Sequence, residues 1–409
     1  MESFETLSPP VRAAMERSLT SGRAALTRRS LVGACGAALG LGAISACGIP
    51  AATSTNSGST EDRSDKEKVL HFSNWPLYID VDDKDENLRP SLRAFSKQTG
   101  IKVDYTEDIS DNDAFFGKIK PQLAAGQDTG RDLMVLTDWM ASRLIRLGWV
   151  QKLDPANMPH AFTNLDQRFR NPAWDPGRAY SYPWAGIQTV IAYNEKATKG
   201  KKITSISQML SESSLKGRVT MLTEMRDTVG LTLLDMGVDP AKVTEDQYDA
   251  AIARIQKSVD SKHIRKFTGN EYGQELASGD IAACVAWGGD LIQLQADSPH
   301  IKYVVPDAGY MTSTDNLLVP AKAKHKKNAE RLIDHYYRPD VAAELAAYVN
   351  YVSPVRGARE ELLKLDKEAA NNPLILPDAA MAAKAHEFRA LTAEEEKRFE
   401  QKFSKLIGA

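Results

Sequence analysis

Hydrophobic and polar positions alternate along the chain in a way that predicts strands followed by helices. From position 69 onward, apolar runs at 69–72, 101–105 and 132–136 predict strands, and amphipathic segments at 88–99 and 113–125 predict the helices between them. Gly100 and Gly126 stand where these helices are expected to stop. Strands and helices at this spacing favour a parallel open sheet, in which ligands gather at the carboxyl ends of the strands.

The same pattern returns in a second section of the chain. Strands are predicted at 187–193, 217–222 and 281–287, and helices at 226–236 and 245–259. A length of 409 residues is also more than one hydrophobic core needs. Two α/β lobes on one chain place a cleft between them, which is a usual location for a small-molecule site.

The N-terminal segment has the features of an export signal. Arg28 and Arg29 precede an uncharged run at 31–46, and this arrangement resembles a twin-arginine signal. Small residues before Cys47 resemble a lipobox, which predicts cleavage after position 46 and a lipid on the Cys47 sulfur. The alternative is an N-terminal membrane helix that is never cleaved. Either way, we expect the body of the protein outside the cytoplasm, anchored to the outer face of the cell membrane or in the periplasm.

A polar stretch follows the predicted lipid site. Residues 47–68 are rich first in serine and threonine and then in charged residues, without apolar periodicity. This composition predicts a flexible tether that holds a folded domain off a membrane surface. The export signal is therefore assigned to 1–46 and the lipid-anchored linker to 47–68.

Composition excludes several classes of protein. The chain has 52 Lys and Arg against 54 Asp and Glu, a net charge of −2, and 42% hydrophobic residues. This balance excludes a basic nucleic-acid-binding protein, an acidic disordered chain and a multi-span membrane protein. Cys284 lies in an apolar run and is expected to be a buried structural residue.

Signatures of catalysis or metal binding are not visible in the sequence. The seven histidines form no HExxH motif or other close metal pair, and there is no GxSxG, CxxC or Walker motif in the folded body. We therefore expect no metal, no cofactor and no enzymatic activity. A surface-anchored enzyme that uses Glu224, Asp227 or Asp315 as acid or base is the alternative from another class.

Aromatic and acidic residues gather just after the predicted strands. They are Trp75 and Tyr78, Asp138 and Trp139, Glu224 and Asp227, Trp287 and Asp290, and Asp315. Aromatic faces hold an organic ammonium through contacts of about 0.5–2 kcal/mol each, and carboxylates orient it through charge-assisted hydrogen bonds. A linear polyamine suits such a site, because its methylene stretches can lie against the same rings. The alternative is that Trp75 and Trp287 are core residues and that the acids are helix caps or solvated turns.

The order of these motifs resembles the polyamine-binding, spermidine/putrescine-type substrate-binding proteins of ABC importers. The resemblance covers about 69–358 and rests on 72–78, 95–103, 132–135, 276–281, 286–290 and 338–342. It implies an α/β, two-lobed periplasmic-binding-protein fold of type II, in which each lobe is an open, mostly parallel sheet flanked by helices. The lobes are expected to close on a ligand like a hinged clamp. The expected lobes are 69–187 with 289–322, and 188–288 with 323–409.

The resemblance also implies roles for aromatic residues. Trp75 and Tyr78 match an aromatic wall at the cleft entrance, and Trp139 stands where the family often has tyrosine. Trp287 matches a tryptophan that stacks on the methylene chain of the ligand, and Tyr351 matches a late aromatic or polar contact.

Polar residues receive roles by the same resemblance. Thr137 matches a hydroxyl contact, and Asp290 and Asp315 match carboxylates that take amino groups. Glu224 and Asp227 match the distal carboxylates less closely, because this stretch is one residue shorter than in the family. The departure puts the length of the ligand in doubt.

Together these observations predict an extracytoplasmic, lipid-anchored protein that captures a polyamine and delivers it to an ABC permease with its ATPase subunits. We expect a monomer that binds no nucleic acid. The nearest alternative is a binding protein of the same fold for another amine, an amino acid derivative or a sugar. Two residues keep this alternative open: Ser313 stands where relatives commonly carry a large aromatic residue, and Arg226 could neutralise one of the acids.

Overall fold

The computed structural model describes residues 61–82, 84–109, 111–269 and 271–408. The predicted export signal with Arg28 and Arg29, and the predicted lipid site Cys47, lie outside the described residues. Among the described helices, none combines the length and the apolar character needed to cross a membrane.

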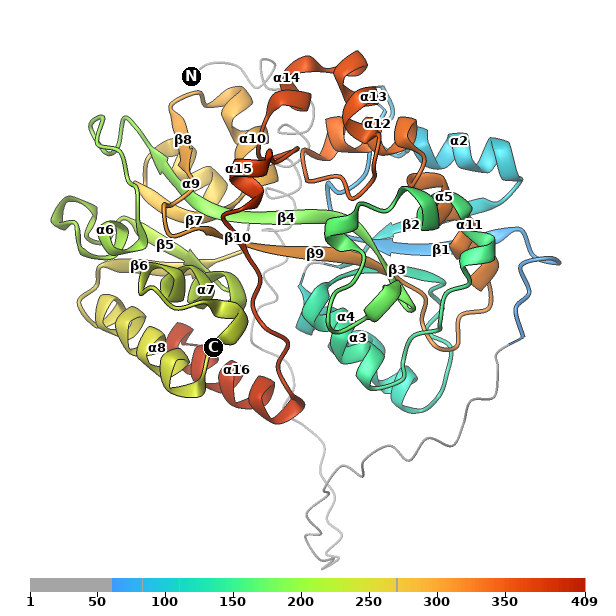
Figure 1. Cartoon of the computed structure of the whole chain (residues 1–409), viewed down its shortest axis with the longest axis horizontal. Coiled ribbons are helices and arrows are strands. Elements are labelled where there is room, and N and C mark those ends of the chain that lie inside the picture. Colours follow the sequence, from blue (N-terminus) through green and yellow to red (C-terminus); the bar gives the residue numbers. More distant parts are fainter. Residues whose placement is uncertain (1–60, 83, 110, 270, 409) are drawn as a thin grey trace, which may run out of the picture. The chain divides into compact units, whose positions relative to one another are not determined.

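A mixed sheet runs through the described part of the chain in the order β2-β1-β3-β9-β4-β7-β5-β6, with β8 beside β4 and β10 beside β9 (Figure 1). The strands are β1 (Val69–Asn74), β2 (Lys102–Glu107), β3 (Leu133–Thr137), β4 (Ser181–Asn194), β5 (Val219–Leu222), β6 (Ile264–Thr268), β7 (Ala283–Trp287), β8 (Ile301–Val304), β9 (Tyr310–Leu318) and β10 (Ala385–His386). β1 is parallel to β2 and β3, and β5 is parallel to β6 and β7. The antiparallel pair β4 and β9 joins these two parallel blocks.

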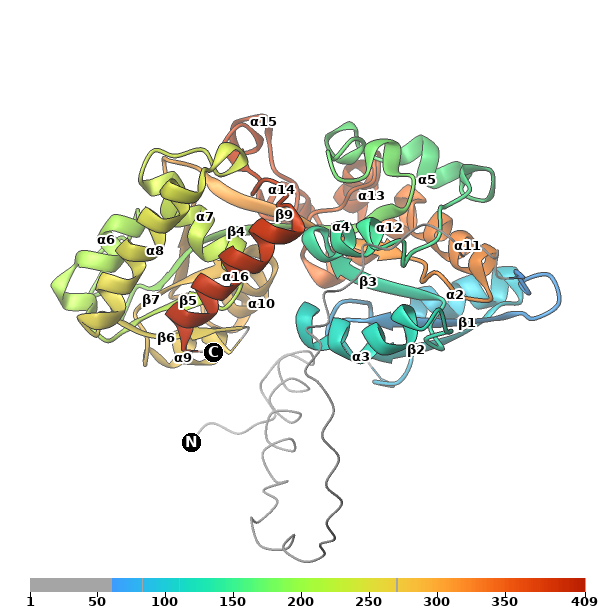
Figure 2. The same ribbon diagram turned by 90° about the horizontal axis from the view of Figure 1, so that it is seen from below.

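Helices lie around both parallel blocks (Figure 2). They are α2 (Pro90–Thr99), α3 (Asn112–Ala124), α4 (Asp138–Arg146), α5 (Pro159–Asn164), α6 (Ile206–Ser211), α7 (Met225–Asp235), α8 (Glu245–Asp260), α9 (Tyr272–Ser278), α10 (Gly288–Asp297), α11 (Lys326–Tyr336), α12 (Pro339–Val349), α13 (Ala358–Leu365), α14 (Lys367–Asn371), α15 (Ala379–Ala382) and α16 (Ala393–Ile407). Single 3-10 turns occur at Pro155–Asn157, Gln167–Phe169, Pro176–Arg178, Ser213–Leu215 and Pro240–Lys242.

The helix signals in the sequence are realised in the structure. Gly100 ends α2 in the left-handed region with φ of 73°, where its N–H donates to the Ser96 carbonyl. Thr244 and Gln247 form a reciprocal capping box that starts α8. The strand predicted at 187–193 is longer than expected, because β4 begins at Ser181 and passes Pro183 with a shift in register.

Two large hydrophobic cores lie on either side of β4 and β9. One gathers residues around β5 and β7, among them Val190, Val219, Val285, Leu291 and Phe399. The other gathers residues around β1 and β3, among them Leu70, Phe72, Leu133, Trp184 and Leu332. A smaller cluster with Met134, Leu136 and Met140 covers the opposite face of β3. Each parallel block therefore has a core of its own, as two lobes require.

The cores divide the chain at places other than the predicted lobe boundaries. Leu291 of α10 and Ile301 of β8, expected in the first lobe, pack in the core around β5 and β7. Leu332 of α11 and Val341 of α12, expected in the second lobe, pack in the core around β1. The reason is that the chain changes sides along β9, which pairs with both β3 and β4, and not directly after β7.

The folded body also begins earlier than the predicted end of the tether. The N–H of Arg63 donates to the Lys324 carbonyl at 2.7 Å, and the N–H of Asn328 donates to Ser64 Oγ at 3.1 Å. Ser64 itself is buried. Residues 61–68 are thus fixed against the start of α11. The sequence showed no periodicity here, because the segment is held by hydrogen bonds and not by an apolar face.

Candidate functional site

A buried carboxylate and a hydroxyl meet where β3 and β9 pair. Thr137, the last residue of β3, is opposite Asp315 in the ladder, and its hydroxyl donates to Asp315 Oδ1 at 2.9 Å. The amide of Asn112 donates to Thr137 Oγ1 at 2.9 Å, so the hydroxyl hydrogen of Thr137 is left for Asp315. Asp315 is only 5% exposed. The hydrogen bond from Thr137 thus fixes the Asp315 carboxylate through Oδ1, and Oδ2 can accept from a further donor.

A second buried carboxylate is held on the other side of β4. Asp227, in the first turn of α7, is 5% exposed. Trp287 Nε1 donates to Asp227 Oδ2 at 2.9 Å, and the Thr189 hydroxyl donates to Oδ1 at 2.8 Å. Thr189 and Trp287 are direct partners in the β4–β7 ladder, so the sheet register places both donors on one carboxylate.

The third carboxylate lies between two tyrosines. Tyr272 Oη donates to Asp290 Oδ2 at 2.7 Å, and Tyr351 Oη donates to Asp290 Oδ1 at 2.9 Å. The backbone N–H of Trp287 donates to Tyr272 Oη at 3.0 Å. A Cβ atom at Gly289 would overlap the Tyr351 ring, so glycine is required for this approach.

Two aromatic rings connect these carboxylates. The rings of Tyr78 and Tyr351 pack edge to face with centroids 5.2 Å apart. The buried Tyr78 hydroxyl lies beside Asp315 and makes no hydrogen bond of good geometry in the described part of the chain. Contacts thus run without a break from Tyr78 through Tyr351 and Asp290 to Tyr272 and Trp287. Seven of the predicted residues are brought together in this way: Tyr78, Thr137, Asp227, Trp287, Asp290, Asp315 and Tyr351.

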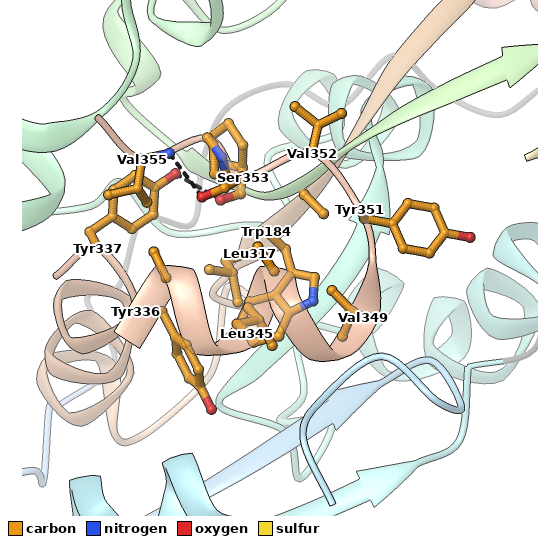
Figure 3. Close-up of a pocket in the computed structure, with 15 residues that line it drawn as sticks. Trp184, Leu317, Tyr336, Tyr337, Leu345, Val349, Tyr351, Val352, Ser353 and Val355 are labelled. Atoms are coloured by element: carbon orange, nitrogen blue, oxygen red, sulfur yellow. Dashed lines mark hydrogen bonds between the residues drawn. The ribbon is translucent and has the colours of Figure 1, made fainter. Parts of the chain in front are cut away.

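Behind Tyr351 the structure is tightly packed. A cavity of about 20 Å³ is lined by Trp184, Tyr336, Leu345 and their neighbours, and Figure 3 shows the Tyr351 ring pointing away from them. This volume is about that of one water molecule. The residues packed around this cavity support the Tyr351 side of the site, and the cavity itself is too small to hold a polyamine.

The remaining predicted residues lie apart from this line of contacts. Trp75 Nε1 donates to the Val135 carbonyl at 3.0 Å, which anchors the ring to β3. Trp139 is buried, and the guanidinium groups of Arg143 and Arg226 lie 4.8 and 4.5 Å from its ring centroid. Arginine side chains therefore cover the Trp139 ring, where the sequence led us to expect a ligand.

Glu224 is also engaged with arginine. Arg226 Nη1 is 3.9 Å from Glu224 Oε1, whereas Arg226 Nη2 is 3.1 Å from Glu396 Oε1. The closer partner of Arg226 is thus Glu396 in α16. Burial raises the pKa of Glu224 to about 8, and Arg226 opposes this shift.

Burial and mutual repulsion make the carboxylates hard to ionise. Burial, together with the charges of Asp138 and Asp227, raises the pKa of Asp315 to about 7. Burial raises the pKa of Asp227 to about 6, against the hydrogen bonds from Trp287 and Thr189. The pKa of Asp138 is raised for the same reason. Carboxylates from both sides of β4 therefore repel one another electrostatically, and a cation between them would relieve this repulsion.

Three residues of the site were missed by the sequence, and a fourth, Asp138, was noted in a strand-end motif but was assigned no role. Asn112 orients Thr137, Thr189 holds Asp227, Tyr272 holds Asp290, and Asp138 adds negative charge. Asp138 had a signal, because it stands between Thr137 and Trp139 in a strand-end motif. Asn112, Thr189 and Tyr272 lie within regular helices and strands, where no local sequence pattern separates a polar residue of a binding site from any other polar residue.

Similarity to known proteins assigns the chain to a family. The family model described as bacterial extracellular solute-binding protein matches residues 91–377. The chain belongs to this family. It is 28% identical over 323 residues to the spermidine/putrescine-binding periplasmic protein of Escherichia coli, which covers 79% of the chain and 87% of that protein. It is 29% identical over 337 residues to the putrescine-binding periplasmic protein PotF of the same organism, with 78% and 86% covered.

The fold is shared with solved structures. A putative spermidine/putrescine ABC transporter protein from Listeria monocytogenes superposes with a TM-score of 0.71 at 24% identity, over 83% of this chain and 99% of that one. The predicted α/β, two-lobed periplasmic-binding-protein fold is confirmed. The members of this family bind solutes for transporters.

Proposed function

We propose that the protein captures a linear polyamine between its two lobes and delivers it to an ABC permease with its ATPase subunits. The observation that carries the proposal is the convergence of Asp227, Asp290 and Asp315, each held by hydroxyl or indole donors on one continuous line of aromatic contacts. Such a site fits a ligand with several ammonium groups joined by methylene chains. The names of the Escherichia coli relatives support the same class of ligand.

Each side chain has a role in this proposal. Asp315, oriented by Thr137, takes one amino group, and Asp227 and Asp290 take another. The faces of Trp287, Tyr78 and Tyr351 lie along the methylene chain. Trp75 shapes the entrance, Trp139 holds Arg226 beside the acids, and Glu224 serves a ligand long enough to reach it. We propose that no reaction is catalysed, since these acids are held in place by hydrogen bonds that suit the binding of a cation.

The lobes in this proposal follow the hydrophobic cores. One lobe comprises about 61–185 with 317–365, and the other about 190–311 with 374–408. Ion pairs join them: Arg143 Nη2 lies 3.0 Å from Glu400 Oε1, and Arg146 Nη2 lies 3.0 Å from Glu396 Oε2. Tyr351 and Asp290 make a further contact between the lobes. Closure on ligand about β4 and β9 would form these contacts, and the permease would recognise the closed form.

Membrane attachment completes the proposal. Residues 1–46 are the export signal, Cys47 carries the lipid, and the segment before residue 61 is the tether of a monomeric protein on the outer face of the membrane. The periplasmic location of the relatives supports this placement. Mass measurement of protein extracted from membranes would reveal the lipid on Cys47, and an unmodified cysteine would refute the anchor.

Calorimetric titration of the full chain in detergent tests the ligand. Putrescine, spermidine and spermine are titrated into the wild type, Trp287→Ala and Asp290→Asn, with Asp307→Asn as a matched control because Asp307 is a fully exposed carboxylate. We expect micromolar binding that both site variants lose and the control keeps. A folded protein that binds none of the three amines would refute the proposal.

Arg226 favours a second candidate, a solute that carries both an ammonium and a carboxylate. Its guanidinium lies over the Trp139 ring and 3.9 Å from Glu224, within the acidic site. A ligand carboxylate could take the place of one of its acidic partners. Titration with γ-aminobutyrate separates the candidates, since tighter binding of this amino acid than of putrescine would favour the second.

A further inference from the structure

Two histidines and an aspartate meet in the lobe built around β1, away from the carboxylates described above. His71 lies in β1, Asp132 directly precedes β3, and His325 caps the start of α11. One ligand atom from each lies within 4.8 Å of the other two. Among the residues that the structure describes, this is the group of histidine, cysteine and acidic side chains that brings three possible metal ligands together.

We propose that His71, Asp132 and His325 bind a divalent transition metal ion, with zinc as the best match. Imidazole nitrogens and a carboxylate oxygen are ligands that zinc prefers. Three protein ligands leave a fourth tetrahedral position for water. This proposal does not depend on the function proposed above, because none of its residues belongs to the polyamine site.

The spacing of the ligand atoms suits the ion. His71 Nδ1 and His325 Nδ1 each lie 2.9 Å from Asp132 Oδ2. In a tetrahedral zinc site with bonds of about 2.0–2.1 Å, neighbouring ligand atoms are about 3.3 Å apart. These two separations are within a few tenths of an ångström of that spacing, and the ligand atoms of the two histidines lie within 4.8 Å of each other, so binding of the ion would draw the two rings together.

The Asp132 carboxylate is fixed by the backbone and retains capacity for a metal. The N–H of His71 donates to Oδ2 at 2.9 Å, and the N–H of His325 donates to Oδ1 at 3.1 Å. A carboxylate offers about four lone-pair directions, so these two bonds leave others facing the imidazole rings. Asp132 is 3% exposed, and its ion pairs are with His71 and His325.

His325 lies between two carboxylates, which a neutral imidazole cannot satisfy. Its Nε2 is 2.8 Å from Glu67 Oε2, while its Nδ1 is 2.9 Å from Asp132 Oδ2. A neutral ring carries one N–H, so one of these contacts would set a ring lone pair against a carboxylate. An imidazolium that donates from both nitrogens satisfies the two carboxylates, and a metal ion on Nδ1 does so as well, because Nε2–H then donates to Glu67.

Outer carboxylates complete the arrangement expected of a metal site. Ligating histidines usually donate their second ring N–H to a carboxylate. Glu67 takes this place for His325, and Asp104 Oδ2 lies 3.8 Å from His71 Nε2. Arg63 and Lys102 pair with these outer acids at 3.5 and 2.6 Å. The two cations thus balance the outer acids and leave the charge of Asp132 for the ion.

Access and position indicate a structural role. The His71 side chain is 44% exposed, so the ion can enter from solvent, whereas His325 is buried. The ligands come from β1, the start of β3 and the start of α11, and Glu67 belongs to the first described segment. A bound metal would tie this segment to the lobe and stabilise it.

The proposal explains why the sequence showed no metal motif. Asp132 is 61 positions after His71 and 193 positions before His325. Motif searches look for histidines close together in the chain. The parallel pairing of β1 with β3 and the docking of α11 bring these residues together.

Zinc binding by the full chain, purified in detergent without a histidine tag, tests the proposal. Metal-free protein is dialysed against zinc chloride with a competing chelator, and bound zinc is measured by mass spectrometry. The variants are His71→Gln and His325→Gln, and Glu67→Gln probes the outer carboxylate. His160→Gln is the matched control, because His160 forms a comparable pair with Asp334 at 2.7 Å but belongs to no group of three possible ligands among the described residues.

We expect one zinc ion per chain and a rise in melting temperature with zinc. His71→Gln and His325→Gln should weaken binding about a hundredfold or more, Glu67→Gln about tenfold, and His160→Gln not at all. X-ray absorption should show imidazole and carboxylate ligands. Should His325→Gln fail to fold, His71→Gln decides, because His71 is half-exposed. No zinc retained by the folded wild type, or equal retention by His71→Gln, would overturn the proposal.

Discussion

Affinity for a polyamine should fall steeply as the pH is lowered from 8 to 5. The pKa of Asp315 is raised to about 7 and that of Asp227 to about 6, in both cases chiefly by burial. A protonated carboxyl must lose its proton before it can pair with an ammonium group. The amines of the ligand have pKa values near 10 and stay charged throughout this range. Binding is therefore strongest above pH 7 and weakens as each carboxyl takes up a proton.

The expected magnitude follows from the two pKa values. At pH 5, Asp315 with a pKa of about 7 weakens binding by about two powers of ten, and Asp227 with a pKa of about 6 by about one. The sum is about a thousandfold, or about 4 kcal/mol. At pH 8 both groups are ionised and contribute almost nothing to the change.

Calorimetric titration with putrescine at pH 8, 7, 6 and 5 measures this slope. Asp315→Asn should remove about two of the three powers of ten, leaving a change of about tenfold between pH 8 and pH 5. Asp307→Asn, which alters a fully exposed carboxylate, should keep the wild-type slope. Buffers of different ionisation enthalpy reveal the protons released on binding. If the folded wild type binds equally well at pH 5 and pH 8, the assignment of Asp315 and Asp227 to the ligand is refuted.

Three further outcomes are expected. Trp287→Ala removes a ring face and the hydrogen bond to Asp227, so affinity should fall about ten- to hundredfold by titration, and unchanged affinity would contradict the stacking role. Glu396→Gln weakens the ion pairs that Arg143 and Arg146 make across the lobes, so stopped-flow measurement should show ligand dissociating several-fold faster; an unchanged rate would mean that these pairs do not hold the closed form. Cys284 is buried with a raised pKa, so a thiol reagent should modify it only after unfolding, and rapid modification of the folded protein would contradict its burial.

Local signals in the sequence predicted much of the fold. The strands and helices of the first block were found near their observed positions, since their apolar residues pack on one face and glycines such as Gly100 end the helices. The acids and aromatic residues at strand ends were also found, because the carboxyl ends of strands are recognisable in the sequence. Seven of the predicted residues are joined by contacts in the structure.

Long-range packing explains the features that the sequence did not predict. The crossing between lobes lies on β9, which pairs with β3 and β4, and no local pattern marks a strand that serves two cores. Tyr272 contacts Asp290 because α9 and α10 pack together, although neither helix carries a motif for this contact. Trp139 was expected beside ligand, but its ring contacts Arg143, which lies one turn further along α4, and Arg226, which α7 brings from the other lobe.

The sequence by itself determined the alternation of strands and helices, the charge that excludes several classes of protein, and the residue types available to hold a cation. Only the tertiary structure decided which of these side chains meet. Asp227, Asp290 and Asp315 gain their raised pKa values or their tyrosine partners from burial and from neighbours far along the chain. His71 and His325 likewise meet at Asp132 through sheet pairing. Local sequence encodes which backbone conformations are favourable, whereas desolvation and contact between distant groups exist only once the chain is folded.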